Sequence, residues 1–251
     1  MTETVSRGAG TAALSSRPSS RPHRFRGRIG VGLAGGFYPA PHRYLLHLSA
    51  SCPRSLRVSI TLDLLGLKES VATTVLARTD GTSDAFASLR SAYEATWHHY
   101  HGPLTVPALC DRWSGRVVSN HTPDILRDLG GLAADAADAG DPRIAALRPP
   151  ALAARIDALR DLLDRDVTPA SRPERVTPRL DLLNRQLTHR PYALGDVLTA
   201  ADVDLWVALV RLDASHGVSS YDGLRNYVRR LGGHPAFHGA VGTVGVGHSA
   251  A

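Results

Sequence analysis

The sequence predicts two unlike parts, an α/β domain followed by an all-α helical bundle. Strand-like apolar runs end near residue 120. After residue 150, apolar residues recur with the three- and four-residue spacing of amphipathic helices. The stretch between is rich in Pro, Ala, Gly and Asp, which is typical of a linker. The predicted segments are a tail with a Gly-rich arm (1–40), the α/β domain (41–131), a linker (132–150), the all-α domain (151–240) and a flexible tail (241–251).

The N-terminal segment is predicted to be a basic, largely disordered tail. Residues 1–28 contain six arginines and one acid, and so account for most of the formal net charge of +6. Disorder is the favoured interpretation, and an organelle transit peptide is the alternative. Since the remaining chain is nearly neutral, we expect no nucleic-acid partner. A GxGxxG pattern at residues 30–35 follows no strand, so it does not indicate a dinucleotide site.

The first elements predicted in the α/β domain are a strand, a helix and a second strand. The apolar run "RYLLHLS" at 43–49 suits a buried strand. Pro53 fits a first helical position and Gly66 a helix end, with Leu56, Ile60 and Leu64 on one face between them. Val71, Thr73 and Val75 alternate as in a strand.

A helix, a hairpin and another helix complete this domain. Ser83 suits a cap for a helix that carries Leu89 and Tyr93 on one face. The stretch 104–120 reads as two short strands around the turn "RWSGR". Thr122 fits a cap, Pro123 a first position and Gly130 a helix end. This order of elements is that of a thioredoxin-like domain with a mixed sheet.

The all-α domain is predicted to contain four helices and a capping box. The stripes are Leu152–Leu163, Val176–Leu187, the mostly apolar "LTAADVDLWVALVRLD" and Tyr221–Leu231. In "TAAD" we expect the Thr199 hydroxyl to accept from the Asp202 amide. The Asp202 carboxylate should accept from the Thr199 amide in return. We assign this box to stability and not to catalysis.

Bulk properties point to a cytoplasmic protein. No apolar run approaches the ~20 residues that a membrane helix needs, so we expect no membrane partner. The N-terminus lacks the apolar core of a secretory signal. The two cysteines, Cys52 and Cys110, form no CxxC pair and should be thiols in a reducing compartment.

Cys52 is the candidate nucleophile. A thiol at a helix N-terminus faces free backbone N–H groups and the positive end of the helix dipole. Arg54 and Arg57 add positive charge nearby. These features favour the thiolate, which is the attacking species. The alternative is a small buried residue without chemistry.

In order along the chain, these motifs resemble the glutathione transferases, and within them the glutathionyl-hydroquinone reductases of the Xi class. The resemblance covers roughly residues 38–235. The matching residues are Tyr44, Leu46, Ser49, Cys52, Pro53 and Arg57, then Leu89, Arg90 and Tyr93, then Gly102, Thr105, Val106, Pro107, Leu109 and Asp111, then Val118, Ser119 and Asn120, and finally Leu194, Gly195, Asp196, Leu198, Thr199, Ala201, Asp202, Leu209, Arg211, Leu212 and Asp213.

The resemblance implies a glutathione transferase fold, a thiol co-substrate, no tightly bound cofactor or metal, and often a homodimer. Cys52 would attack the sulfur of a thiol-conjugated hydroquinone, and a second thiol would resolve the mixed disulfide. Pro107 would follow a cis peptide bond, leaving the Val106 backbone free to pair with the cysteinyl part of the thiol. The implied thiol-binding residues are Pro53, Arg54, Arg57, Val106, Pro107, His121 and Thr122.

Two departures from the family pattern bear on the thiol. The family's Trp-Ala-His after Cys-Pro is Arg54-Ser55-Leu56 here, and its Glu-Ser is His121-Thr122. The co-substrate is therefore glutathione or another low-molecular-weight thiol such as mycothiol. A non-catalytic ligand- or protein-binding role is the alternative function. The start of the helix at His121 could hold a carboxylate or be a plain cap.

Two other features are interpreted as structural. Cys110 lies in a predicted strand and should be a buried thiol. The histidines of "WHHYH" at 97–101 fall at a helix end, where they suit the dipole, and we expect no acidic or cysteine partners nearby for a metal. We therefore predict no metal site there.

Overall fold

The computed structural model describes residues 24–30, 36–76, 84–136 and 147–239. The predicted C-terminal tail, most of the GxGxxG pattern, the middle of the linker and the predicted cap Ser83 lie outside these residues. The elements are β1 (Tyr44–Leu48), α1 (Pro53–Leu64), β2 (Ala72–Val75), α2 (Asp84–Thr96), β3 (Ala108–Asp111), β4 (Arg116–Ser119), α3 (Thr122–Ala136), the short η2 (Pro150–Leu152), α5 (Ala153–Asp166), α6 (Pro173–His189), α7 (Ala200–His216), η3 (Val218–Ser220) and α8 (Asp222–Gly232).

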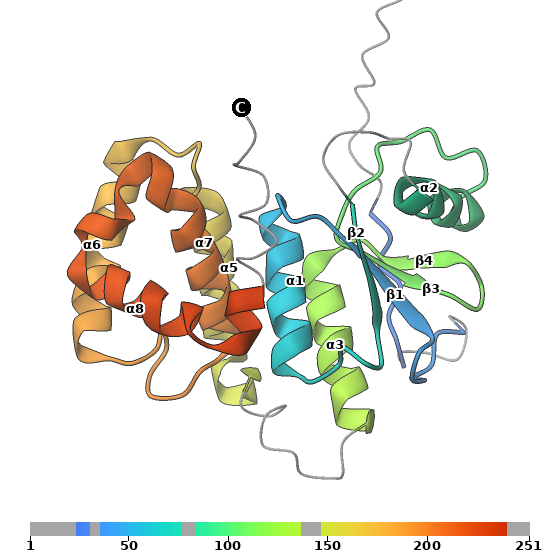
Figure 1. Ribbon diagram of the computed structural model, residues 1–251, viewed down its shortest axis with the longest axis horizontal. Helices are drawn as coiled ribbons and strands as arrows, with labels where there is room; N and C mark the ends of the chain where they lie inside the picture. Colours follow the sequence, from blue (N-terminus) through green and yellow to red (C-terminus); the bar gives the residue numbers. More distant parts are fainter. Residues whose placement is uncertain (1–23, 31–35, 77–83, 137–146, 240–251) are drawn as a thin grey trace, which may run out of the picture.

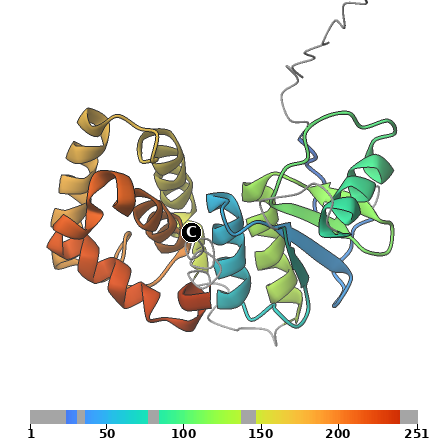
Figure 2. The same ribbon diagram turned by 45° about the horizontal axis from the view of Figure 1, so that its top comes forward.

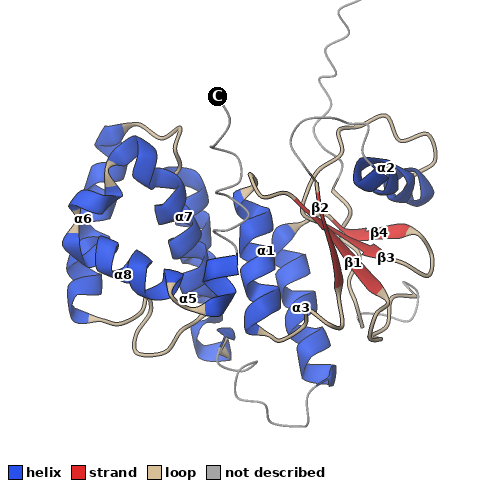
Figure 3. Cartoon of the chain, viewed as in Figure 1, coloured by secondary structure: helices blue, strands red, loops and turns tan. Residues whose placement is uncertain are grey.

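In the described residues, four strands form one mixed sheet in the first half of the chain (Figure 3). The strand order is β2-β1-β3-β4, with β1 parallel to β2 and antiparallel to β3. β3 and β4 form the predicted hairpin, with an irregularity in register between Leu109 and Cys110. The order of elements and the mixed sheet confirm the predicted α/β class.

The sheet is covered on both faces because its strands alternate between two apolar clusters. Tyr44, Leu46 and Leu48 pack with apolar residues of α1 and α3 on one face. Ala108 and Cys110 face the other side, where α2 covers them. Figure 1 shows α1 and α3 side by side, with α2 across the sheet from them.

α1 is buried from two sides, between the sheet and the helical half of the chain (Figures 1 and 2). Val58 and Leu62 pack in the sheet cluster, whereas Leu56 and Ile60 join a cluster formed mainly by α5 to α8. The predicted apolar stripe of α1 therefore holds the two halves together. None of the described helices is long and apolar enough to cross a membrane.

Residues 24–30 differ from the predicted disordered tail, because they lie along β4 and α3. Phe25 is buried against α2, and Arg26 forms an isolated bridge with Ser119 of β4. Arg26 and Arg28 bind the buried carboxylates of Asp124 and Asp128 on α3, at 2.8 and 2.6 Å. The arginines whose positive charge suggested disorder in the sequence thus form ion pairs with two buried carboxylates.

α3 is longer than predicted. It continues through Gly130 and Gly131 to Ala136 instead of ending at Gly130. A glycine inside a helix costs about 1 kcal/mol relative to alanine. Leu129, Leu132 and Ala133 are buried around this point, and their packing offsets that cost.

The capping box at the start of α7 forms, but the Thr199 hydroxyl donates a hydrogen bond instead of accepting one. The Thr199 amide donates to Asp202 Oδ2 at 2.8 Å, as predicted. The Thr199 hydroxyl, however, donates to the same carboxylate, and the Asp202 amide donates to the Thr199 carbonyl. Asp202 also accepts from the Ala193 amide and the Tyr227 hydroxyl, so the box joins α7 to α8.

Candidate active site

Cys52 lies at the N-terminus of α1, directly after the loop that follows β1. It is the N-cap residue in an extended conformation, and Pro53 occupies the first helical turn. Its side chain is half-buried and donates a weak hydrogen bond to the Val106 carbonyl, with 3.6 Å between sulfur and oxygen. Because its thiol caps no backbone N–H of α1, it remains available for chemistry at the end of the helix.

The segment opposite Cys52 contains the predicted cis peptide bond. The bond between Val106 and Pro107 is cis, which confirms the prediction, and β3 begins at the next residue. Val106 is half-buried, whereas Pro107 is buried. The structure therefore brings three of the predicted site residues, Cys52, Val106 and Pro107, to one place.

A network of polar side chains holds Thr105, the residue before Val106. The Tyr93 hydroxyl lies 2.9 Å from Thr105 Oγ1, and Asn120 donates to the same hydroxyl at 3.0 Å. Asn120 in turn accepts from the Phe25 amide. The spacing of residues in the sequence did not predict this supporting role for Tyr93, Thr105 and Asn120. These residues meet only when α2, β4 and residues 24–30 are packed together.

His121 and Thr122 lie at the N-terminus of α3. Figure 1 shows that α1 and α3 begin at the same end of the sheet. The His121 carbonyl accepts from the amides of Asp124 and Ile125. His121 therefore takes the capping position that the sequence assigned to Thr122, and Thr122 is the buried first residue of the helix.

The imidazole of His121 is turned toward Asp124, with 2.9 Å between Nδ1 and Oδ2. Burial alone would raise the pKa of Asp124. Hydrogen bonds from Arg26 and the contact with His121 instead hold that pKa below its usual value. The carboxylate is therefore charged at neutral pH and orients the side chains of Arg26 and His121 at this helix end.

The two arginines that follow Cys52 have different environments. Arg54 is exposed in the first turn of α1. Arg57 is buried and reaches the helical half, where Nη2 lies 2.7 Å from Asp164 and Nε lies 3.3 Å from Asp204. Sequence spacing alone put Arg57 beside the thiol site, whereas its ion pairs bridge the two halves of the chain.

Arg57 nevertheless contributes positive charge to the Cys52 end of α1. Burial lowers its pKa, but Asp204, Asp164 and Cys52 together raise it above the ordinary value, so the guanidinium stays charged. Asp204 is shared with Arg160, at 2.9 Å, and is almost completely buried. Burial raises the pKa of Asp204 to about 6, against the opposing effect of both arginines.

Cys110 has the structural role that the sequence predicts. It is buried within β3 on the α2 face of the sheet. Burial, with a contribution from Asp111, raises its pKa to about 12. The two thiols of the chain therefore differ in exposure: Cys52 is half-buried, and Cys110 is buried.

We expect alkylation to distinguish these two thiols. Iodoacetamide at neutral pH should modify Cys52, while Cys110 in the folded protein should react at least about a hundredfold more slowly, because its thiolate is scarce and covered. Peptide mass spectrometry over a time course measures both sites in one sample. Equal rates at the two cysteines would contradict the assigned environments.

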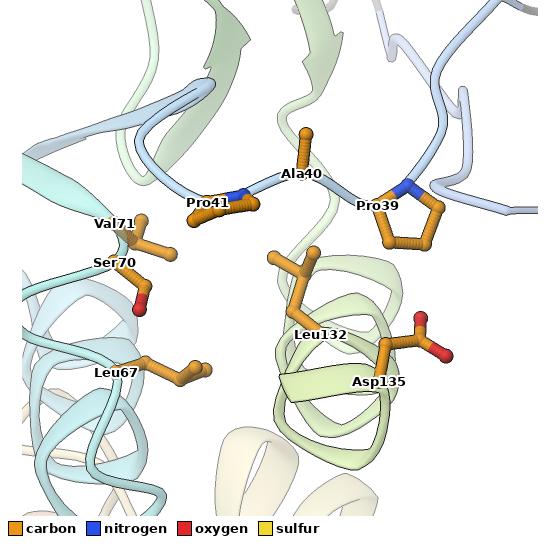
Figure 4. Close-up of a pocket in the computed structure, with 8 residues that line it drawn as sticks. All are labelled: Pro39, Ala40, Pro41, Leu67, Ser70, Val71, Leu132 and Asp135. Carbon is orange, nitrogen blue, oxygen red and sulfur yellow. The ribbon is translucent and has the colours of Figure 1, made fainter. Parts of the chain in front are cut away.

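Two other features contain none of the predicted site residues. Within the described residues, no three His, Cys, Asp or Glu side chains are grouped so as to hold a metal, and His98, His99 and His101 make ring contacts only with one another. A cavity of about 400 Å³ lies between residues 39–41, the loop after α1 and the end of α3. Figure 4 shows the side chains that line it. None of the predicted site residues lines it.

Comparison with known proteins identifies the family. The family model "Glutathione S-transferase, C-terminal domain" matches residues 174–230. A glutathionyl-hydroquinone reductase of Sphingobium chlorophenolicum is 30% identical, with 89% of this chain and 81% of that protein covered. The chain belongs to the glutathionyl-hydroquinone reductase family of glutathione transferases.

Solved structures of glutathione transferases have the same fold. The glutathione-bound structure of a homologue from Escherichia coli matches with a TM-score of 0.73 and 28% identity, over 88% of this chain and 85% of that one. The Xi-class transferase of Phanerochaete chrysosporium has a TM-score of 0.74 at 24% identity, over 90% of each chain. These likenesses confirm the predicted fold. The sequence relatives place the chain among thiol-dependent transferases and reductases.

Proposed function

We propose that Cys52 is the nucleophile of a thiol-dependent reductase that acts on thiol-conjugated hydroquinones. The observation that carries this proposal is the position of Cys52, half-buried at the N-terminus of α1 and 3.6 Å from the Val106 carbonyl. The membership of the chain in the glutathionyl-hydroquinone reductase family supports the choice of substrate class.

The reaction consists of two displacements at sulfur. The Cys52 thiolate attacks the sulfur of the conjugate, and the bond between that sulfur and the aromatic ring breaks. The ring carbon keeps the electron pair and takes a proton, which releases the free hydroquinone. A second thiolate then attacks the mixed disulfide at its non-protein sulfur, releasing a small disulfide and the Cys52 thiolate. Overall, the sulfur of the second thiol and the sulfur of the conjugate are oxidised to one disulfide, while the ring carbon is reduced as its bond to sulfur is replaced by a bond to hydrogen.

The structure suggests how the thiol is held. The backbone of Val106 would pair with its cysteinyl part, next to Cys52 and Pro107. At the start of α3, beside His121, the Thr122 N–H suits a carboxylate of the thiol, whereas the His121 N–H already donates to Ser119. Exposed Arg54 adds positive charge in the first turn of α1, next to Cys52. Arg57 contributes charge from within and stays fixed by its acids.

The proposal also concerns which thiol, glutathione or mycothiol, is the co-substrate. The Escherichia coli homologue was solved with glutathione bound, which favours glutathione. His121 and Thr122 replace the family's Glu-Ser pair, which favours a thiol that needs no acidic partner, such as mycothiol.

Steady-state assays with two pairs of conjugate and thiol would test both the proposed reaction and the choice of thiol. The glutathionyl conjugate of a hydroquinone is supplied with glutathione, and the mycothiol conjugate with mycothiol. We expect turnover with one pair to exceed the other by about tenfold or more, because buried polar groups discriminate strongly between ligands. Release of hydroquinone is followed by chromatography. No turnover with either pair would overturn the proposal and favour a ligand-binding protein.

A further inference from the structure

Tyr93 of α2 presents its hydroxyl to one residue beside the candidate active site. Its side chain is fully buried. The hydroxyl oxygen lies 3.0 Å from the Thr105 carbonyl oxygen, 2.9 Å from Thr105 Oγ1 and 3.3 Å from the Thr105 amide nitrogen. Thr105 precedes Val106, whose carbonyl accepts from Cys52. A side chain outside the predicted site therefore holds both backbone groups of the residue before Val106.

The hydrogen bonds of this hydroxyl have defined directions. A tyrosine hydroxyl donates one hydrogen and accepts two hydrogen bonds. The Tyr93 hydroxyl accepts from the Thr105 amide and from Asn120 Nδ2. Asn120 Nδ2 also donates to Thr105 Oγ1 at 3.2 Å, and the Phe25 amide, which donates to Asn120 Oδ1, fixes the orientation of this side chain. The Tyr93 hydrogen is thus left for the Thr105 carbonyl.

The Thr105 carbonyl belongs to the same peptide group as the Val106 N–H. Among the described residues the one cis peptide bond is the next in the chain, between Val106 and Pro107, so the bond between Thr105 and Val106 is trans. In a planar trans peptide the C=O and N–H groups point in opposite directions. By holding the carbonyl, the Tyr93 hydroxyl therefore fixes the direction of the Val106 N–H.

The position of the Tyr93 ring does not depend on its hydroxyl. The ring packs edge-on against Phe25, with 5.3 Å between the ring centroids, and its centroid lies 5.0 Å from that of Tyr100. Further along α2, the Thr96 hydroxyl oxygen accepts from the Val117 amide of β4 at 2.7 Å. Because these contacts hold the ring and the helix, Tyr93→Phe removes the hydrogen bonds and leaves the packing in place.

We propose that the Tyr93 hydroxyl is a positioning group for the thiol co-substrate. By orienting the Val106 N–H, it selects thiols whose cysteinyl unit carries a carbonyl that accepts from this N–H. The inference rests on the proposed function, in which the Val106 backbone pairs with the cysteinyl part of the thiol. It adds α2 to the elements that recognise the thiol, and it gives Tyr93 no part in the chemistry at sulfur.

The reaction of Cys52 with disulfides separates recognition from reactivity. The Cys52 thiolate attacks one sulfur, forms a mixed disulfide and releases the other half as a thiolate. The probes are glutathione disulfide and mycothiol disulfide, which contain cysteinyl carbonyls, and 2-hydroxyethyl disulfide, which has none. In Tyr93→Phe we expect the faster of the two cysteinyl disulfides to react about tenfold more slowly, because the oriented donor is lost. Rates with 2-hydroxyethyl disulfide and iodoacetamide should change by less than about twofold.

Tyr100→Phe is the matched control, because it removes the same atom from a neighbouring ring. Its hydroxyl donates to the Pro103 carbonyl, and every rate should stay within about twofold. Asn120→Asp is a second variant. The new carboxylate only accepts, so it takes the Tyr93 hydrogen from the Thr105 carbonyl, and the same selective loss is expected.

Three results would overturn the inference. If Tyr93→Phe and Asn120→Asp keep the wild-type preference for the cysteinyl disulfide, this inference fails and the proposed function stands. Equal slowing with every probe would show a general structural role for Tyr93. A wild-type Cys52 that reacts no faster with either cysteinyl disulfide than with 2-hydroxyethyl disulfide would overturn the proposed function as well.

Discussion

Replacing Cys52 with alanine is expected to lower kcat for release of the hydroquinone by at least about a thousandfold. No other described thiol can take its place, because Cys110 is buried on the opposite face of the sheet from α1. The fold should be retained, since the Cys52 thiol is half-buried and its one hydrogen bond, to Val106, is weak. Chromatography of the released hydroquinone measures the effect.

Cys110→Ser is the matched control for this substitution. It removes the other thiol and should leave kcat within about threefold, although its burial predicts some loss of stability. A Cys52→Ala enzyme with wild-type turnover would show that the conjugate is reduced without covalent catalysis.

Replacing Arg57 with alanine is expected to lower the free energy of unfolding by about 3 kcal/mol or more at neutral pH. Arg57 joins α1 to the helical half through Asp164 and Asp204, and its loss leaves the buried Asp204 with Arg160 as its remaining cation. Guanidinium denaturation followed by circular dichroism measures the change. Arg155→Ala, an exposed substitution on α5, is the control.

The loss of stability should grow with pH. The pKa of Asp204 is raised to about 6 in the folded protein, and Arg57 is one of the groups that restrain this rise. A carboxyl group with a raised folded pKa destabilises the fold as pH increases from its unfolded to its folded pKa. Without Arg57 the folded pKa rises further, so this window extends upward. The difference between variant and wild type should thus be larger at about pH 8 than at about pH 5.5. An equal difference at both values would contradict the assigned coupling.

Local patterns in the sequence were sufficient to predict most elements. Pro53 and Gly66 bracket α1, "RWSGR" gives the turn between β3 and β4, and Val106-Pro107 is cis as expected. In each case neighbours along the chain determine the conformation. The homodimer and the cytoplasmic location stay predictions.

Features that depend on packing between distant segments could not be predicted in this way. α3 passes Gly130 because its apolar residues are covered by the sheet cluster. Residues 24–30 lie along α3 because Asp124 and Asp128 bind Arg26 and Arg28, about a hundred residues earlier in the chain. Arg57 acquires its role only when α5 and α7 pack on α1, as no local spacing links it to Asp164 or Asp204.

The mixed disulfide on Cys52 is the most direct test of the proposed mechanism. Reduced enzyme, freed of small thiols, is mixed with one equivalent of a thiol-conjugated hydroquinone and analysed by intact and peptide mass spectrometry. We expect one equivalent of hydroquinone to be released and the mass of one thiol to be added at Cys52, both reversed by reductant. Release of hydroquinone without an adduct, or an adduct on another residue, would contradict nucleophilic attack by Cys52.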